Sequence, residues 1–130
     1  MSNYKQTKKE AWIYYKKWMK EKVYCPALHQ DVRISRKGWD HLVSGTSSRR
    51  RNIKDKHLRL TLLKSANYVI KNAEFPAISN RNGVKYIGLK ARVNNNGMNA
   101  FIKVLLKQDK QGKFYFYSVM KAKKGRLSQV

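Results

Sequence analysis

The hydrophobic pattern of the chain changes from a helical period to strict alternation near residue 84, and this change limits the folds open to it. Apolar and polar residues alternate over 84–94 and again over 98–107. The N-N-N-G sequence at 94–97 and the D-K-Q-G sequence at 109–112 are typical of turns. A mostly apolar segment over 113–121 predicts a last strand that is central and covered on both sides. The order predicts an α+β fold, with N-terminal helices packed on a C-terminal antiparallel β-meander.

Two segments in the first third of the chain have the pattern of amphipathic helices. Residues 5–22 predict a basic helix with an aromatic stripe, which we expect to dock on the domain rather than on a membrane surface. A short strand over 32–35 leads into a second, short helix that ends at Gly45. On that helix, Trp39, Leu42 and Val43 share one face and His41 lies opposite.

A longer helix follows three consecutive arginines, Arg49, Arg50 and Arg51. Arg59 falls inside its apolar stripe, which consists of Leu58, Leu62, Leu63, Ala66, Val69 and Ile70. An arginine in such a stripe is costly unless it is paired or faces an anion. One imidazole and four guanidiniums within this stretch therefore suggest a phosphate site.

The charge of the chain indicates a polyanionic partner. Lys and Arg number 30 against 7 Asp and Glu, which gives a formal net charge of +23. Such a charge repels itself in the folded state. Because the charge is spread along the whole chain, nucleic acid is a better fit than an anionic membrane.

The chain organisation and its single cysteine carry further expectations. We expect a basic helix and linker over 1–29, an α+β domain over 30–121 and a basic tail over 122–130. Cys25 is the single cysteine, so no internal disulfide can form, which fits a reducing, cytoplasmic compartment. The alternative is that the chain is delivered as a detached toxin module. Cys25 and His29 have no second Cys/His pair at zinc-ligand spacing, so we expect no metal site there.

The residues available for catalysis favour a reaction without a metal or cofactor. Nucleases that bind Mg²⁺ need several carboxylates, and no two of the seven in this chain lie at a recognisable motif spacing. RNA carries its own nucleophile, the 2′-hydroxyl, so its cleavage needs only a base, a proton donor and positive charge on the phosphorane. Histidine suits the proton transfer and arginine suits the phosphate.

The order of motifs resembles a known enzyme group. A strand ending in Ser35 is followed by G-W-D-H-L, by a helix containing R-L-T-L-L, and by a meander that closes on F-Y-S-V. Over about residues 30–121 this resembles the small metal-independent ribonucleases grouped around barnase, EndoU, the colicin ribonucleases and RelE, especially their phage-associated branch. The resemblance implies a catalytic histidine, His41, a serine on the last strand, Ser118, and a basic residue, Arg59 or Lys103.

Each of these residues also has a purely structural interpretation. His41 is an ordinary exposed histidine in the simplest case. Ser118 shares its face of the predicted strand with Phe114, Phe116 and Met120, which favours a buried filler, whereas Tyr115 and Tyr117 point the other way. The structural alternative for the three consecutive arginines is a run of solvated charges. The remaining candidates are expected to contact RNA: Arg49, Arg50, Arg51, Lys54, His57, Tyr117 and Lys121.

Together these features predict a toxin-like RNA endonuclease. The expected reaction is transesterification to a 2′,3′-cyclic phosphate, with tRNA, mRNA or rRNA as substrate and no cofactor. The alternative is a non-catalytic RNA- or DNA-binding module that uses the same basic face. We also expect an acidic antitoxin or immunity protein as a partner and no membrane association.

Overall fold

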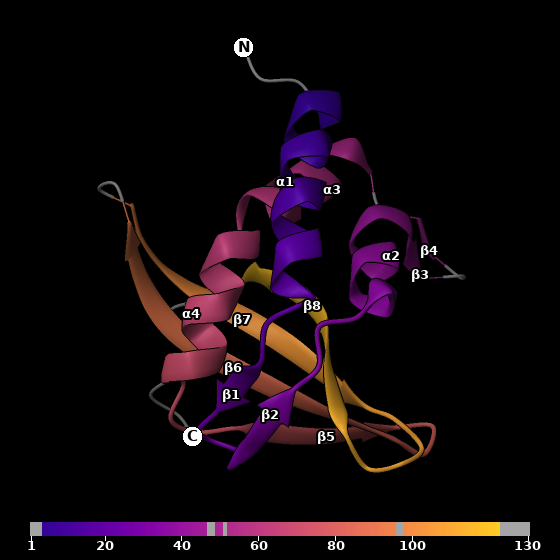
Figure 1. Ribbon diagram of the computed structural model, residues 1–130, viewed down its shortest axis with the longest axis vertical. Coiled ribbons are helices and arrows are strands. Elements are labelled where there is room, and N and C mark those ends of the chain that lie inside the picture. Colours follow the sequence, from indigo (N-terminus) through magenta and orange to yellow (C-terminus); the bar gives the residue numbers. More distant parts are fainter. Residues whose placement is uncertain (1–3, 47–48, 51, 96–97, 123–130) are drawn as a thin grey trace.

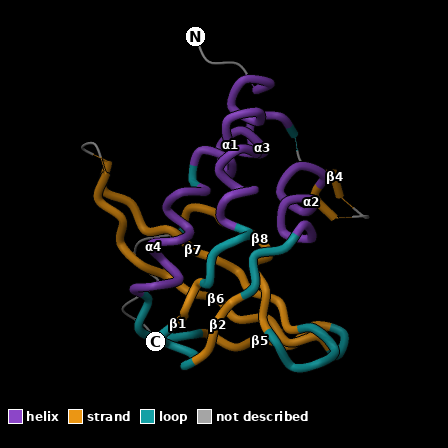
Figure 2. Tube along the Cα trace, in the orientation of Figure 1, coloured by secondary structure: helices purple, strands orange, loops and turns teal. Residues whose placement is uncertain are grey.

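The structure of the chain is a computed structural model that describes residues 4–46, 49–50, 52–95 and 98–122. Its helices are α1 (Tyr4–Trp18), α2 (Arg36–Ser44), α3 (Ile53–Thr61) and α4 (Leu63–Asn72). Helical segments dominate the first half of the chain and strands the second half (Figure 2). The predicted α+β fold is therefore confirmed.

The strands form one antiparallel sheet and two short hairpins. The sheet has the order β5-β6-β7-β8, and its strands are β5 (Ala77–Arg81), β6 (Val84–Asn95), β7 (Met98–Gln108) and β8 (Phe114–Lys121). The hairpins pair β1 (Val23–Cys25) with β2 (Gln30–Val32), and β3 (Gly45–Thr46) with β4 (Arg49–Arg50). The long strands β6 and β7 follow the two alternating segments of the sequence, so the predicted meander is confirmed as the last three strands of the sheet.

The core lies between the helices and one face of the sheet. In Figure 1, α4 lies in front of the sheet and packs against β6 and β7, while α1 lies in front of α3. Tyr15 and Trp18 of α1 are fully buried against Phe116 of β8. The indole Nε1 of Trp18 donates a hydrogen bond to Asn67 Oδ1 at 3.0 Å, which satisfies its buried polar atom. The predicted docking of the first helix on the domain is therefore confirmed, and none of the described helices has the length and apolarity needed to cross a membrane.

The helix boundaries differ from the prediction at two places. α1 ends at Trp18 rather than at residue 22. The single long helix after the arginines is wrong, because α3 and α4 meet at Leu62. The break changes the phase of the apolar stripe, so Leu60 is 4% exposed and buried while Leu58 is 40% exposed.

Strand β5 and both short hairpins were not predicted, and the bounds of the predicted strand over 32–35 are wrong. All five residues of β5 are exposed, so this strand has no alternation to detect. The hairpin of β1 and β2 turns through His29, which adopts a positive φ of 55°. Val32 ends β2, and Arg33 forms an isolated parallel bridge to Tyr115.

The predicted central position of β8 is also wrong, because β8 is an edge strand. Its apolar sequence is explained by what covers that edge. Arg33 donates a backbone hydrogen bond to Phe114 and accepts one from Phe116, at 3.0 and 2.8 Å. Beyond this bridge, α2 and α3 pack against β8. The edge is therefore covered by helices and a short bridge rather than by another full strand.

Candidate active site at the edge of the sheet

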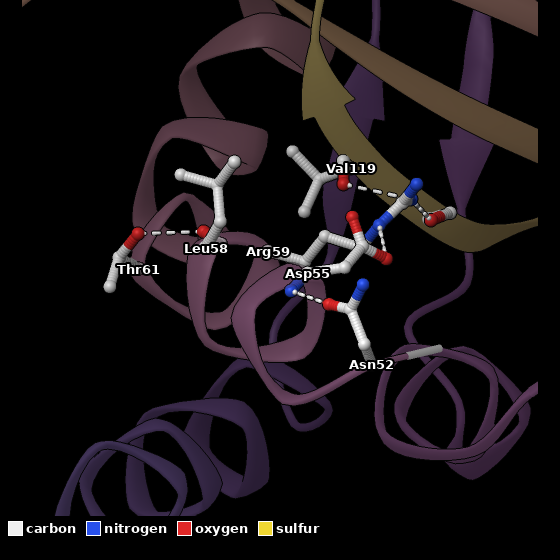
Figure 3. A network of polar contacts seen from close by, with 7 residues as sticks. Asn52, Asp55, Leu58, Arg59, Thr61 and Val119 are labelled. Atoms are coloured by element: carbon white, nitrogen blue, oxygen red, sulfur yellow. Dashed lines mark hydrogen bonds and ion pairs between the residues drawn. The ribbon is translucent and has the colours of Figure 1, made fainter. Parts of the chain in front are cut away.

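The N-terminal turn of α3 sets the position of Arg59. Asn52 caps the helix, and its Oδ1 accepts a hydrogen bond from the backbone N–H of Asp55 at 2.8 Å. Asp55 lies one turn before Arg59, and its Oδ2 accepts a hydrogen bond from Arg59 Nε at 3.0 Å. Figure 3 shows this succession from Asn52 through Asp55 to Arg59. The cap and the ion pair together hold the guanidinium toward β8.

Arg59 reaches β8 through a second nitrogen. Its Nη1 donates to Ser118 Oγ at 2.7 Å and to the carbonyl oxygen of Val119 at 3.3 Å. The contact with Val119 is visible in Figure 3. The Arg59 side chain is 14% exposed and paired, which is one of the two arrangements that offset the cost of an arginine in an apolar stripe. The guanidinium is thus fixed from two directions, by its own helix and by a strand 59 residues later in sequence.

A β-bulge brings Ser118 to this position. Leu105 of β7 pairs with Ser118, whereas Leu106 pairs with Phe116, so Tyr117 is the extra residue. Because paired residues share a face, Ser118 lies on the face of Leu105, opposite the buried Val104 and Leu106. The prediction that Ser118 shares a face with Phe116 is therefore wrong, since the bulge reverses the alternation between them. Ser118 is 1% exposed and accepts a hydrogen bond from Arg59, so its hydroxyl contacts the guanidinium rather than solvent.

Close packing of α2 places His41 against the same bulge. A Cβ on Gly38 would lie 2.5 Å from the carbonyl oxygen of Phe116, so only glycine allows α2 to approach β8 this closely. Three residues later, the half-buried His41 ring stacks on the ring of Tyr117, with 3.9 Å between centroids and 25° between planes. His41 thus lies against the residue next to Ser118. We call the group Asp55, Arg59, Ser118, Tyr117 and His41 the β8 edge site.

Lys103 lies on the same face of the sheet as Ser118, but its side chain leans away from β8. It pairs with Lys90 of β6 and Met120 of β8. A Cβ on Gly88 would lie 3.1 Å from Lys103 Cε, so the lysine stem crosses Gly88 of β6. Burial, with contributions from the charges of Lys90 and Arg81, lowers the pKa of Lys103. Of the two basic candidates, Arg59 is the one that contacts Ser118.

The predicted RNA-binding residues lie in different parts of the fold. Lys54 and Lys121 are exposed at the start of α3 and the end of β8. His57 faces α1, where its Nε2 lies 2.9 Å from Thr7 Oγ1. The backbones of Arg49 and Arg50 form β4, while their side chains and the whole of Arg51 lie outside the described part of the chain.

Sequence reasoning missed Asp55 as the partner of Arg59. The spacing of four residues between an acid and a later base on one helix was the available signal. It also did not single out three residues whose ring–cation contacts continue from Tyr117 across the sheet, namely Lys107, Tyr86 and Arg81. The alternation of 84–94 correctly placed Tyr86 on the face opposite Ile87 and Leu89, but alternation does not indicate which strands are neighbours.

The chemistry available at the β8 edge site is proton transfer beside a fixed positive charge. An imidazole held by stacking can accept or donate a proton, and a guanidinium held by three hydrogen bonds can stabilise an anion without reorganising. Within the described residues, no three His, Cys, Asp or Glu side chains gather as metal ligands.

The comparisons with known proteins bear on the family alone. The family model of the large polyvalent protein-associated domain 3 matches residues 2–116. No curated protein and no solved structure matches the chain. The family match is compatible with the phage-associated character implied by the sequence resemblance, while a relation to the barnase, EndoU, colicin and RelE group stays a prediction.

Proposed function

The chain belongs to the large polyvalent protein-associated domain 3 family, and from the geometry of the β8 edge site we propose that it is a metal-independent endoribonuclease. The observation that carries this proposal is the hydrogen bond of Arg59 to Ser118, beside the stack of His41 on Tyr117. These residues come from α2, α3 and β8, and their convergence was expected from the resemblance to metal-independent ribonucleases.

The proposed reaction uses the 2′-hydroxyl of RNA as its nucleophile. His41 accepts the proton of the 2′-hydroxyl, and the 2′-oxygen attacks the adjacent phosphorus. The P–O5′ bond then breaks, the 5′-oxygen takes up a proton from solvent, and His41 returns its proton to solvent. The products are a 2′,3′-cyclic phosphate and a 5′-hydroxyl end, so no water is consumed in this step. Arg59 stabilises the phosphorane, and Ser118 holds Arg59 in place.

The charge of the protein supports an RNA substrate for this chemistry. A net charge of +23 attracts a polyanion from all directions and favours rapid association at low salt. The single carboxylate of the β8 edge site, Asp55, is bound to Arg59 rather than directed at an incoming phosphate.

The experiment is an RNA gel with EDTA present, run on the wild type, His41→Asn and His29→Asn. His29 is an exposed histidine in the β1–β2 turn with a positive φ, which asparagine tolerates, so it is a matched control. We expect the wild type and His29→Asn to cleave RNA and His41→Asn to lose about 100-fold or more in rate. Equal cleavage by all three proteins would remove His41 from the reaction.

The second candidate function is a nucleic-acid-binding module without catalysis. The observation that favours it is the low exposure of Arg59, 14%, together with its pairing to Asp55, because a structural arginine is held in the same way. The same gel separates the two candidates. A binding module shifts RNA in a native gel and leaves it intact at every protein concentration.

A further inference from the structure

A row of alternating aromatic and cationic side chains crosses the sheet from the β8 edge site. The ring centroid of Tyr117, on β8, lies 3.9 Å from the ring centroid of His41 and 5.2 Å from Lys107 Nζ. Lys107 Nζ also lies 5.9 Å from the ring centroid of Tyr86, and Arg81 Cζ lies 5.7 Å from the same ring. The rings of Tyr86 and Tyr117 meet edge to face at 5.7 Å. We call Tyr117, Lys107, Tyr86 and Arg81 the outer row.

The register of the strands places the outer row on the face opposite the core. Tyr86 pairs directly with Lys107, and their neighbours Ile87 and Leu106 are buried on the helix side. The row crosses β8, β7, β6 and β5 on a diagonal, because Arg81 and Tyr117 each lie two residues along their strands from the residue that pairs with Tyr86 or Lys107. Three inter-strand spacings amount to about 14 Å, which is long enough for more than one nucleotide.

The outer row has the composition of a surface that binds single-stranded nucleic acid. Tyrosine rings stack on unpaired bases, whose flat faces are hidden in a duplex. Lysine and arginine beside the rings neutralise phosphates. Both cations of the row lie against rings, and within the described residues neither forms an ion pair with a carboxylate, in contrast to Arg59 with Asp55. The charge of this surface is therefore available to an external anion.

More cations of the same face flank the outer row. Lys90 and Lys103 face each other across β6 and β7, and Arg92 covers the ring of Phe101. After burial, the charges of Lys90 and Arg81 contribute to the lowered pKa of Lys103. An anionic strand on this face relieves that repulsion, which is a second reason to expect a polyanion here.

We infer that the outer row is a base-stacking subsite that holds single-stranded RNA across the sheet and leads it to the β8 edge site. This inference rests on the proposed function for the choice of RNA, but the stacking itself does not require cleavage. Tyr86 is the stacking platform, since Tyr117 is already stacked on His41. Lys107, between the two rings, neutralises a phosphate.

The test uses two fluorescent oligonucleotides that the proposed reaction cannot cleave. The first is a 2′-O-methyl oligouridine strand, and the second is the same backbone with abasic spacers in place of the bases. We expect the wild type to bind the first about tenfold more tightly, the size expected for one stacked base. Tyr86→Leu should bind both strands with similar affinity, while Tyr86→Phe, which keeps the ring and reports on folding, retains the preference.

Matched variants separate stacking from charge. Lys107→Gln should weaken both strands equally and reduce the salt dependence of log affinity by about 0.7. Tyr24→Leu and Lys71→Gln remove an exposed tyrosine of β1 and an exposed lysine of α4, and both should behave as the wild type. Binding tests the outer row even if RNA is never cleaved, and cleavage tests the β8 edge site even if Tyr86 is dispensable.

Three results would overturn the inference. The first is equal wild-type affinity for the intact and abasic strands, which would leave only phosphate binding. The second is an unchanged preference for the intact strand in a folded Tyr86→Leu variant. The third is that polyglutamate displaces the intact strand as effectively as the unlabelled strand does. This result would indicate that the surface binds an acidic protein.

Discussion

The β8 edge site and the outer row hold their cations in opposite ways. Arg59 is 14% exposed and bound to a carboxylate, a hydroxyl and a backbone carbonyl. Lys107 and Arg81 lie against tyrosine rings. Hydrogen bonds fix a guanidinium at one point, whereas cation–ring contacts are weaker and tolerate movement. The first arrangement suits a charge that must act at one atom, and the second suits a strand of variable sequence.

The largest expected effect comes from removing the fixed charge. Arg59→Leu should lower the rate of RNA cleavage by about 100-fold or more, because a preorganised charge at the phosphorane is lost. It should also lower the free energy of unfolding by about 1–3 kcal/mol, since the buried Ser118 hydroxyl loses its donor. Cleavage rates and urea unfolding measure the two effects separately.

A double variant separates stability from catalysis at the same position. Arg59→Leu combined with Ser118→Ala replaces both hydrogen-bonding partners by apolar groups, which is nearly neutral for stability. We expect most of the lost stability to return while cleavage stays slow. Recovery of cleavage along with stability would mean that Arg59 supports the fold only.

The next effect concerns the approach of α2 to β8. Gly38→Ala places a methyl group 2.5 Å from the Phe116 carbonyl oxygen and 2.7 Å from the Tyr15 hydroxyl. α2 must then move, which should cost about 1–3 kcal/mol and displace His41 from Tyr117. Thermal unfolding and cleavage should both report the change, while Ser44→Ala, at the exposed end of the same helix, should change neither.

Smaller changes are expected for the arginine run at the hairpin of β3 and β4. Replacing Arg49, Arg50 and Arg51 by alanine should weaken RNA binding uniformly across sequences. The slope of log affinity against log salt should become shallower, by about 0.7 per lost phosphate contact on a single strand. The control replaces Lys8, Lys9 and Lys20, which are exposed and carry the same total charge. Equal slopes for the two triple variants would mean that the arginines act only through net charge.

The smallest effect is the pH dependence that Lys103 introduces. Burial lowers its pKa in the folded protein, so the protonated lysine destabilises the fold. The penalty is present in full below the folded pKa and disappears as the pH rises to the ordinary value of 10.5. Lys103→Met should therefore raise the melting temperature slightly at pH 7, and the difference from the wild type should shrink toward pH 10.5. A constant difference would contradict this.

The parts of the fold that follow a regular period were predictable from the sequence. The alternation of β6 and β7, the helical face of Trp39 and Leu42, and the α+β order all depend on residues near one another in the chain. β5 was missed because all five of its residues are exposed. The division of α3 from α4 was missed because the spacing of apolar residues in the sequence stays helical across Leu62, although the structure changes which of them are buried.

The sequence singled out four residues of the candidate site, His41, Arg59, Tyr117 and Ser118, but neither Asp55 nor the contacts among them. The cost of an arginine among leucines indicated that Arg59 needs a partner, and both Asp55 and Ser118 supply one. The extra residue in β8 that turns Ser118 toward Arg59 has no signal in the alternation of F-Y-F-Y-S-V. The resemblance allowed either Arg59 or Lys103 as the basic residue of the site, but the stem of Lys103 crosses Gly88 rather than approaching Ser118.

The most direct test of the β8 edge site is the chemistry of the cut ends. A short single-stranded RNA is incubated with the wild type in EDTA, beside the same RNA carrying one 2′-deoxynucleotide at each observed cut position, and the products are analysed by mass spectrometry. Attack by the 2′-oxygen predicts 2′,3′-cyclic phosphate ends and no cleavage at the deoxy positions. Intact RNA, or cleavage that continues at the deoxy positions, would contradict the proposed mechanism.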